Sequence, residues 1–371
     1  MSTFSLKLNA AKQSASWQLA LDKFPFNLGK PTAPSLTEPD NKGKEQSIKP
    51  RRLREIRDRY TAAKPSLDDA AKRQQDFLAV LDRQHGPRFR RVTLVNTSRL
   101  LLHLGRASVL ENVGLHCERT TGLPVIPGTA VKGVLSTWAC WEGNLNREQF
   151  SVARSKFAPE VARVLGSNPA HDPDSSDVAG CITFLGGFPQ TAPSLELDIV
   201  TPHPEEGRGR ITPSPFLAIK ADTKWDFVLI ASPRLAETEV APMLDAAGGW
   251  LSECLTQIGL GAKTAAGYGN FRPLTDSEKQ NDTARFGALL QALQDRETRA
   301  EMTDEDRVYH DFVKAVTDWA PLARDIANKP EPDKSHILRF FRSEEGKAVI
   351  KNWPSNDKAK ARKQALKDAG L

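Results

Sequence analysis

Residues 259–269 of this 371-residue chain read GLGAKTAAGYG, with two glycines on each side of Lys263 and its small neighbours. So little side-chain bulk lets a ligand approach the main chain, where N–H groups would surround a phosphate and Lys263 would neutralise it. The alternative interpretation is a glycine-rich turn that only joins a helix to a strand. A Walker A loop is excluded because no G-x-x-x-x-G-K-[ST] pattern fits the segment.

The residues around this loop predict a helix before it and a strand after it. Apolar residues recur on one side of the segment 250–258, as in a helix with one buried face. Gly259 supplies a left-handed cap at the end of that helix. Phe271 follows in a short strand.

Further upstream, alternating apolar and polar residues predict most of a sheet. The first strand begins near Arg88 and runs to Leu104, and further strands are expected at 181–185, 195–200, 216–221 and 225–231. With the helices, the order is strand, helix, strands, helix, strand. This order predicts an α+β, ferredoxin-like (RRM-like) fold with helical N-terminal and C-terminal extensions.

The segment 126–133, IPGTAVKG, predicts the start of the first of these two helices. Thr129 is the expected N-cap, and Lys132 lies in the first turn. A cation is unfavourable at the positive end of the helix dipole unless an anion compensates it, which favours an anion site. The alternative is a lysine that only accompanies the helix start.

The connection between this first strand and helix is too long for a passive turn. Arg106 and Arg119, with the hydroxyls of Ser108 and Thr120, would line a groove for a nucleic-acid backbone. His116, Cys117 and Glu118 invite a metal or acid–base interpretation, but neighbours on an extended chain point to opposite faces. A polar loop with satisfied hydrogen bonds is the preferred interpretation.

Composition limits the class of protein without fixing it. The formal net charge is +6, which fits a phosphate-bearing partner and also fits many enzymes. The four cysteines form no CxxC pair, so neither a zinc site nor a disulfide framework is expected. No apolar run is long enough to cross a membrane and no signal peptide is recognisable, so a cytoplasmic protein is expected.

Three domains are expected along the chain. Residues 1–87 form an N-terminal extension with a flexible Pro/Gly/Ser/Lys-rich linker at 29–50 and two basic helices. Residues 88–273 form the ferredoxin-like RNA-binding domain. Residues 274–371 form a helical, basic C-terminal extension.

Three motifs in chain order resemble the RAMP superfamily of CRISPR effector subunits. They are LLHLGRAS at 101–108, GLPVIPGTAVKG at 122–133 and GAKTAAGYG at 261–269. They are similar to the first strand, the IPG-S/T-x-x-K-G helix start and the C-terminal glycine-rich loop of the family. The segments LGRASVLE at 104–111 and DIVTPH at 198–203 resemble subunits of type III-B (Cmr) complexes in particular.

The resemblance implies a crRNA-binding, backbone-capping subunit of a type III-B ribonucleoprotein that recognises target RNA in antiviral defence. The sheet face and both loops would hold the guide backbone, and the segment 198–215 would be a protruding hairpin. The implied partners are crRNA, target RNA, backbone RAMP subunits and small helical subunits, with no cofactor, no metal and no membrane. The expected RNA-binding residues are Arg106, Ser108, Arg119, Thr129, Lys132, Arg208, Arg210, Gly261, Lys263, Thr264, Gly267 and Tyr268.

No catalytic residue is expected, because slicing relatives place an aspartate in the loop after the first strand. Here the matching position falls near Asn112, with Glu111 beside it as the one catalytic candidate. The alternative function is a metal-dependent endoribonuclease that uses Glu111, His116 and His103. That enzyme would need clustered carboxylates or histidine pairs, which the sequence does not offer.

Overall fold

A computed structural model describes residues 17–18, 21, 37–102, 114–143, 159–166, 179–200 and 213–371. The chain divides into two compact units, Met1–Leu290 and Gln291–Leu371. None of the described helices is both long enough and apolar enough to cross a membrane.

The first unit is built on a five-stranded sheet in the order β4-β5-β8-β3-β9. Every neighbouring pair of these strands is antiparallel. The strands are β3 (Phe89–Asn96), β4 (Ile126–Pro127), β5 (Ile182–Pro189), β8 (Lys224–Ala231) and β9 (Phe271–Pro273). The prediction of a mixed fold of helices and sheet is therefore confirmed.

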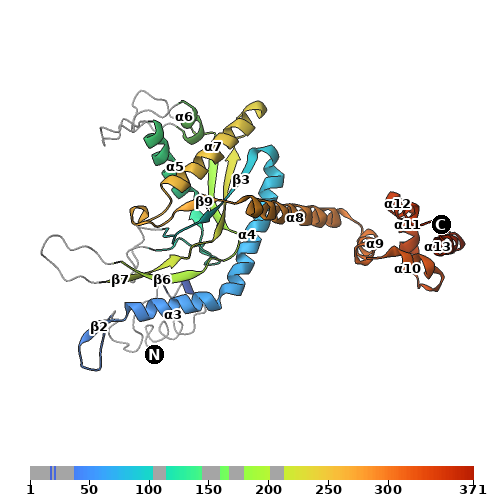
Figure 1. The fold of residues 1–371 in the computed structure, drawn as a ribbon, viewed down its shortest axis with the longest axis horizontal. Helices are drawn as coiled ribbons and strands as arrows, with labels where there is room; N and C mark the ends of the chain where they lie inside the picture. Colours follow the sequence, from blue (N-terminus) through green and yellow to red (C-terminus); the bar gives the residue numbers. More distant parts are fainter. Residues whose placement is uncertain are drawn as a thin grey trace. The chain divides into compact units, whose positions relative to one another are not determined.

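Two helices, α5 (Gly128–Gly143) and α7 (Glu237–Gln257), cover one face of this sheet (Figure 1). Side chains alternate across a strand, so Trp225, Phe227 and Leu229 of β8 point to the same side. All three are buried in the main core with Leu135 of α5 and Leu251 of α7. Burying each such side chain stabilises the fold by roughly 1.5–3 kcal/mol.

The opposite face of the sheet is covered by α4 (Lys64–His85) and by the first half of α8 (Asp276–Glu301). Leu78 of α4 and Phe286 of α8 form a buried cluster with Phe89 and Val228 of the sheet. Both faces are thus largely covered by the chain itself, although Thr183 and Leu185 of β5 are exposed. The expectation that the sheet face holds RNA stays a prediction, limited to the part that this cover leaves exposed.

A network of charged and polar side chains lies within this second face. The Nη1 atom of Arg91 is 2.7 Å from carboxylate oxygens of both Asp226 and Asp282, and Arg285 contacts the same two carboxylates at 3.2 and 3.1 Å. Gln190 donates to both as well. Burial alone would raise the pKa of Asp282, but Arg91 and these hydrogen bonds hold it below its ordinary value. The network fastens α8 to the sheet.

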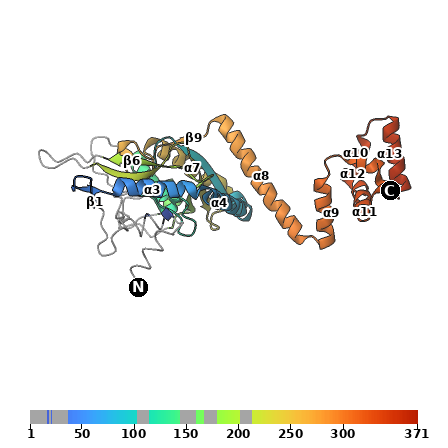
Figure 2. The same cartoon turned by 90° about the horizontal axis from the view of Figure 1, so that it is seen from below.

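A separate two-stranded sheet is formed by β6 (Leu195–Val200) and β7 (Ser214–Ile219). The helix α3 (Lys49–Ala62) lies beside it (Figures 1 and 2). A small hairpin, β1 (Thr37–Pro39) and β2 (Glu45–Ser47), precedes α3. The pairing of β6 with β7 confirms the base of the hairpin predicted at 198–215.

The first strand of the sheet is shorter than predicted. It ends at Asn96 instead of running on to Leu104, because the buried amide of Asn96 bonds to a neighbouring turn. Its Nδ2 donates to the carbonyl of Lys220 at 3.0 Å, and its Oδ1 accepts from the N–H of Thr223 at 3.1 Å. The chain turns there, and Leu100 then bridges to β7.

The second unit is helical and has a hydrophobic core of its own. Its helices are α9 (Asp304–Ala315), α10 (Trp319–Arg324), α11 (Asp333–Arg342), α12 (Glu344–Lys351) and α13 (Asp357–Asp368), and the end of α8 precedes them. Trp319 stacks on Phe340 with ring centroids 3.6 Å apart, and Phe341 packs edge-on against both. Leu366 of α13 is buried in the same core.

Candidate nucleic-acid interface

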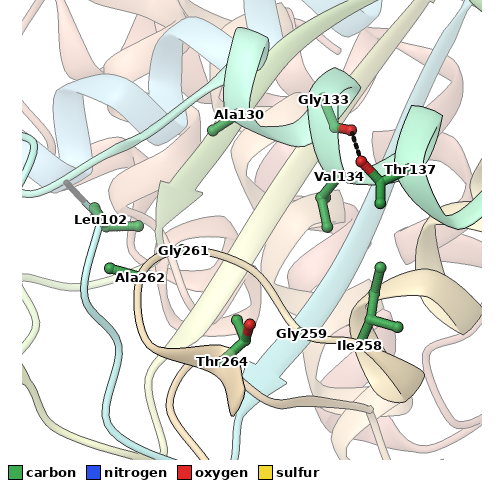
Figure 3. A pocket seen from close by; sticks show the side chains of 10 residues that line it. All are labelled: Leu102, Ala130, Gly133, Val134, Thr137, Ile258, Gly259, Gly261, Ala262 and Thr264. Carbon is green, nitrogen blue, oxygen red and sulfur yellow. Dashed lines mark hydrogen bonds between the residues drawn. The ribbon is translucent and has the colours of Figure 1, made fainter. Parts of the chain in front are cut away.

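A groove of about 340 Å³ separates the glycine-rich loop from α5 (Figure 3). The loop contributes Gly259, Gly261, Ala262 and Thr264, and α5 contributes one side of its first three turns. Small side chains line most of it: the full lining is Leu102, Ala130, Gly133, Val134, Thr137, Ile258, Gly259, Gly261, Ala262 and Thr264. The structure therefore brings together two motifs that are far apart in the sequence, the helix start at 126–133 and the glycine-rich loop at 259–269.

Three glycines fix the base of the loop. Gly259, Gly261 and Gly269 all have positive φ angles, which other residues rarely adopt. A Cβ added at Gly261 would lie 2.0 Å from the carbonyl oxygen of Leu101, and one at Gly269 would lie 1.9 Å from that of Leu260. These glycines let neighbouring main chains touch, so their first role is structural.

The rim of the loop is different. Gly267 also has a positive φ of 87°, but a Cβ there would meet nothing within 4 Å. Lys263 adopts the left-handed conformation with φ of 61°, which is uncommon for a residue with a side chain. It precedes the short 3₁₀ turn η2 (Thr264–Ala266). Gly267 is exposed and Lys263 is half-buried, and both have left-handed main-chain conformations.

The main-chain amides of the loop are mostly used within the protein. The N–H groups of Leu260, Ala262 and Gly269 donate to carbonyls of Gly269, Leu101 and Arg99. Those of Ala266, Gly267 and Tyr268 donate to Lys263 and Thr264. In the described part of the chain, the amides of Gly259, Gly261, Lys263, Thr264 and Ala265 have no acceptor. The predicted ring of phosphate-binding amides is therefore reduced to these five, of which the last three are successive.

The start of α5 corrects the sequence prediction for Thr129. The helix begins at Gly128, so Thr129 is its second residue and is not the N-cap. A Cβ at Gly128 would lie 2.0 Å from the carbonyl oxygen of Phe184, which shows how closely the helix start presses on β5. The helix thus begins two residues earlier than an N-cap at Thr129 predicts.

Lys132 and Thr129 face a second cavity, of about 430 Å³, on the other side of α5. Thr183 of β5 and Gly166, which follows the short helix α6 (Pro159–Leu165), line it as well. Lys132 is exposed and makes no ion pair with any described residue. The two predicted lysines thus belong to adjoining surfaces around the start of α5 and not to one pocket.

Gly133 stands out among the residues of α5. It lies inside the helix, it lines the groove, and a Cβ there would meet nothing within 4 Å. A glycine inside a helix costs roughly 0.5–1 kcal/mol relative to alanine, and the protein's own packing does not require this one. The set of predicted site residues omits Gly133, although a glycine on the polar side of a predicted helix is visible in the sequence.

Tyr268 is held by the hairpin. Its hydroxyl donates to Oδ2 of Asp198 at 2.5 Å, and Arg99 contacts the same carboxylate oxygen at 3.0 Å. Burial, and then the bond to Asp198, raise the pKa of Tyr268 to about 12. Its ring packs near Phe216. The contact that involves Arg99 and Asp198 was not part of the sequence prediction, since it joins three distant segments.

Arg119 and Thr120 lie elsewhere, in a cavity of about 600 Å³ beside the junction of α3 and α4. Arg59 and Ser66 line the same cavity. The hydroxyl of Thr120 donates to Glu118 at 2.6 Å, as expected for a satisfied polar loop. These residues therefore do not join the groove between α5 and the glycine-rich loop.

Other predicted site residues lie outside the described ranges: Arg106, Ser108, Glu111, Arg208 and Arg210. His103 of the alternative nuclease lies outside them too. Among the described residues, no three His, Cys, Asp or Glu side chains are grouped as ligands for a metal ion.

Residues 98–272 match the sequence model of the RAMP superfamily. The matched segment contains both α5 and the glycine-rich loop, and it is somewhat less than half of the chain. The resemblance of the three motifs to the RAMP superfamily therefore agrees with the family match across this segment. No curated protein sequence matches the chain.

Distant likenesses to solved structures accompany the family match. A chain of "Type III-B Cmr-beta bound to cognate target RNA" is 17% identical with a TM-score of 0.41, covering 73% of this chain and 89% of its own. Cmr6 from Pyrococcus furiosus is 21% identical with a TM-score of 0.32, covering 50% and 98%. A chain of a CRISPR RNA-guided surveillance complex is 15% identical with a TM-score of 0.31, covering 50% and 66%.

Proposed function

We propose that this chain is a crRNA-binding subunit of a cytoplasmic type III-B CRISPR (Cmr) effector complex, corresponding to the sixth RAMP subunit. The guide backbone would cross the start of α5 between the glycine-rich loop and Lys132. The observation that carries the proposal is the groove between α5 and this loop, within the segment that matches the RAMP superfamily. Glycine, alanine and threonine make up most of the groove lining, beside Leu102, Val134 and Ile258, and such small side chains favour close approach of a sugar-phosphate backbone.

The order of elements supports the ferredoxin-like form of the fold. Along the chain the central elements run β3-α5-β5-β8-α7-β9, and in the sheet the corresponding strands lie as β5-β8-β3-β9. A β-α-β-β-α-β unit of this kind is the ferredoxin-like motif. Its two helices lie on one face, which brings the end of α7 and its following loop close to α5.

The surface around the groove suits phosphates and not base edges. Neither lysine lines the groove itself: Lys263 lies on the loop between the lining residues Ala262 and Thr264, and Lys132 faces the cavity on the other side of α5. Both are cations without carboxylate partners among the described residues, and the groove lining offers few groups that would hydrogen-bond to a base edge. Contacts to phosphates position a strand and carry no sequence information. A subunit that must accept any guide sequence needs this kind of contact.

We further propose that the chain binds RNA without cutting it, as a cap on the backbone of the complex. Glu111 is a single carboxylate, whereas metal-assisted cleavage of a phosphodiester needs a set of oxygen ligands or a base at the scissile phosphate. The proposed partners are crRNA, target RNA, backbone RAMP subunits and small helical subunits.

The test is the salt dependence of RNA binding by Lys132→Ala and Lys263→Ala, measured by fluorescence anisotropy with short single strands of several sequences. Each substitution removes one phosphate contact, so each should weaken binding equally for all sequences. Each should also flatten the slope of log K against log salt by about 0.7.

The matched control is Lys72→Ala. Lys72 is exposed, as Lys132 is, but it lies on α4, which covers the opposite face of the sheet. Its substitution should leave the slope unchanged. If the slopes of Lys132→Ala and Lys263→Ala equal that of the control, the proposal is wrong.

A further inference from the structure

The second unit presents a lysine stripe on α13, defined as Lys360, Lys363 and Lys367. These residues are spaced i, i+3 and i+7, so they project from one side of the helix. All three are exposed. At a rise of 1.5 Å per residue, the stripe is about 10 Å long.

The opposite side of α13 holds the helix in place. Ala359 and Leu366 are buried, and Leu366 belongs to the aromatic core of the unit. The guanidinium of Arg362 lies 5.6 Å from the ring centre of Trp353. The stripe is therefore displayed on a helix whose orientation within its unit is fixed, so its charges need little ordering upon binding.

Some cations elsewhere in the unit are paired with carboxylates, whereas others, such as Lys334 and Lys358, have no carboxylate partner among the described residues. Arg299 pairs with Asp311 at 2.6 Å, and Lys314 pairs with Asp295 at 2.5 Å, joining α9 to the end of α8. Lys363 and Lys367 have no such partner among the described residues. Lys360 has only Asp357, at 3.5 Å and fully exposed, where an ion pair contributes little.

Charge is also segregated along the chain. Residues 351–371 contain six basic side chains and two acidic ones. The basic side chains are Lys351, Lys358, Lys360, Arg362, Lys363 and Lys367, and the acidic ones are Asp357 and Asp368. A cluster of lysine and arginine along one helix is the pattern of a phosphate-binding surface.

We propose that the lysine stripe binds the phosphodiester backbone of single-stranded RNA, independently of sequence, as a second contact separate from the groove at α5. A protein partner is disfavoured because the stripe surrounds no apolar centre, which most protein interfaces have. A membrane surface is disfavoured because the apolar side of α13 is already buried in its own unit. Phosphates need neither feature.

The test uses the full chain with Lys360, Lys363 and Lys367 all changed to Ala, and it measures binding of a short single-stranded RNA over a range of salt. Three phosphate contacts at about 0.7 each predict that the slope of log K against log salt falls by about two. The control changes Lys279, Lys314 and Lys347 to Ala. These are also exposed, but each has a carboxylate nearer than that of Lys360, at 3.3, 2.5 and 2.7 Å, so the slope should fall much less than for the stripe.

Both sets are made in the wild-type chain and in a chain that carries Lys132→Ala and Lys263→Ala. Substitution of the three stripe lysines should lower the slope of log K against log salt by the same amount in both backgrounds. A stripe variant that binds like its control in both overturns this inference, whatever the groove variants do. A stripe effect without any effect of Lys132 and Lys263 overturns the proposed function and leaves this inference standing.

Phosphatidylserine vesicles provide the third arm, since they carry phosphates on a surface instead of a strand. We expect the wild-type chain and the stripe variant to show the same level of vesicle binding. If the stripe governs vesicle binding and leaves RNA binding unchanged, the partner is a membrane and the proposal of RNA is wrong.

Discussion

The two sides of the central sheet use charge in opposite ways. On the side of α4 and α8, Arg91 and Arg285 share the carboxylates of Asp226 and Asp282, and Asp226 is fully buried. On the side of α5, the exposed Lys132 has no carboxylate partner among the described residues.

The difference separates residues that hold the fold from residues available to a ligand. A buried charge must find a partner inside the protein, because leaving it unpaired costs several kcal/mol. An exposed cation has no such requirement and remains free for a phosphate. In this chain, positive charge alone therefore does not identify the proposed binding surface; a cation available to a phosphate must also lack a carboxylate partner.

The largest expected effect is that of Asp226→Ala. The substitution leaves Arg91 and Arg285 facing a single carboxylate in a buried site, so it should destabilise the fold by about 3–5 kcal/mol. Urea unfolding measures the change. Asp245→Ala is the control: Asp245 pairs with Arg90 at 2.7 Å on the exposed surface, where about 1 kcal/mol or less is expected. Equal effects of the two variants would refute the contrast between buried and exposed charge.

Smaller losses of stability are expected for substitutions of the loop glycines. Comparing Gly269 at the base of the loop with Gly267 at its rim separates the structural glycine from the exposed one. Gly269→Ala places a Cβ 1.9 Å from a carbonyl oxygen, so the main chain must move, at about 2 kcal/mol or more. Gly267→Ala meets only the cost of a positive φ, about 1 kcal/mol.

Thermal unfolding should rank the two variants in this order. RNA affinity should fall for both, for Gly269→Ala because the loop is distorted and for Gly267→Ala because the rim is crowded. Unchanged RNA binding by a folded Gly267→Ala variant would indicate that the rim is a plain turn.

Much of the fold follows from local sequence patterns. Strict alternation predicts the strand at 195–200, which is β6, and helical spacing with a following glycine predicts the end of α7. The pairing of the glycine-rich loop with the start of α5 was expected from the family resemblance.

What could not be predicted depends on contacts between distant segments. The amide of Asn96 ends β3 through bonds to residues more than a hundred positions away, which no local pattern reveals. The packing of α4 and α8 against the second face of the sheet likewise depends on distant contacts. The apolar residues of these helices predict that one side of each helix is buried, but not which part of the protein it packs against. The same limit explains why Lys132 and the groove-lining residues were predicted as one site although they face different sides of α5.

The most direct test of the account is the RNA affinity of Gly133→Ala beside its stability. Alanine meets nothing within 4 Å there and is the better helix former, so the variant should be more stable by roughly 0.5–1 kcal/mol. It should nevertheless bind RNA more weakly, because the added methyl group occupies the groove. Gly249→Ala, at an equally open position in α7, should gain the same stability and keep full affinity. A Gly133→Ala variant that is stabilised and binds RNA as tightly as Gly249→Ala would contradict the claim that the backbone crosses this groove.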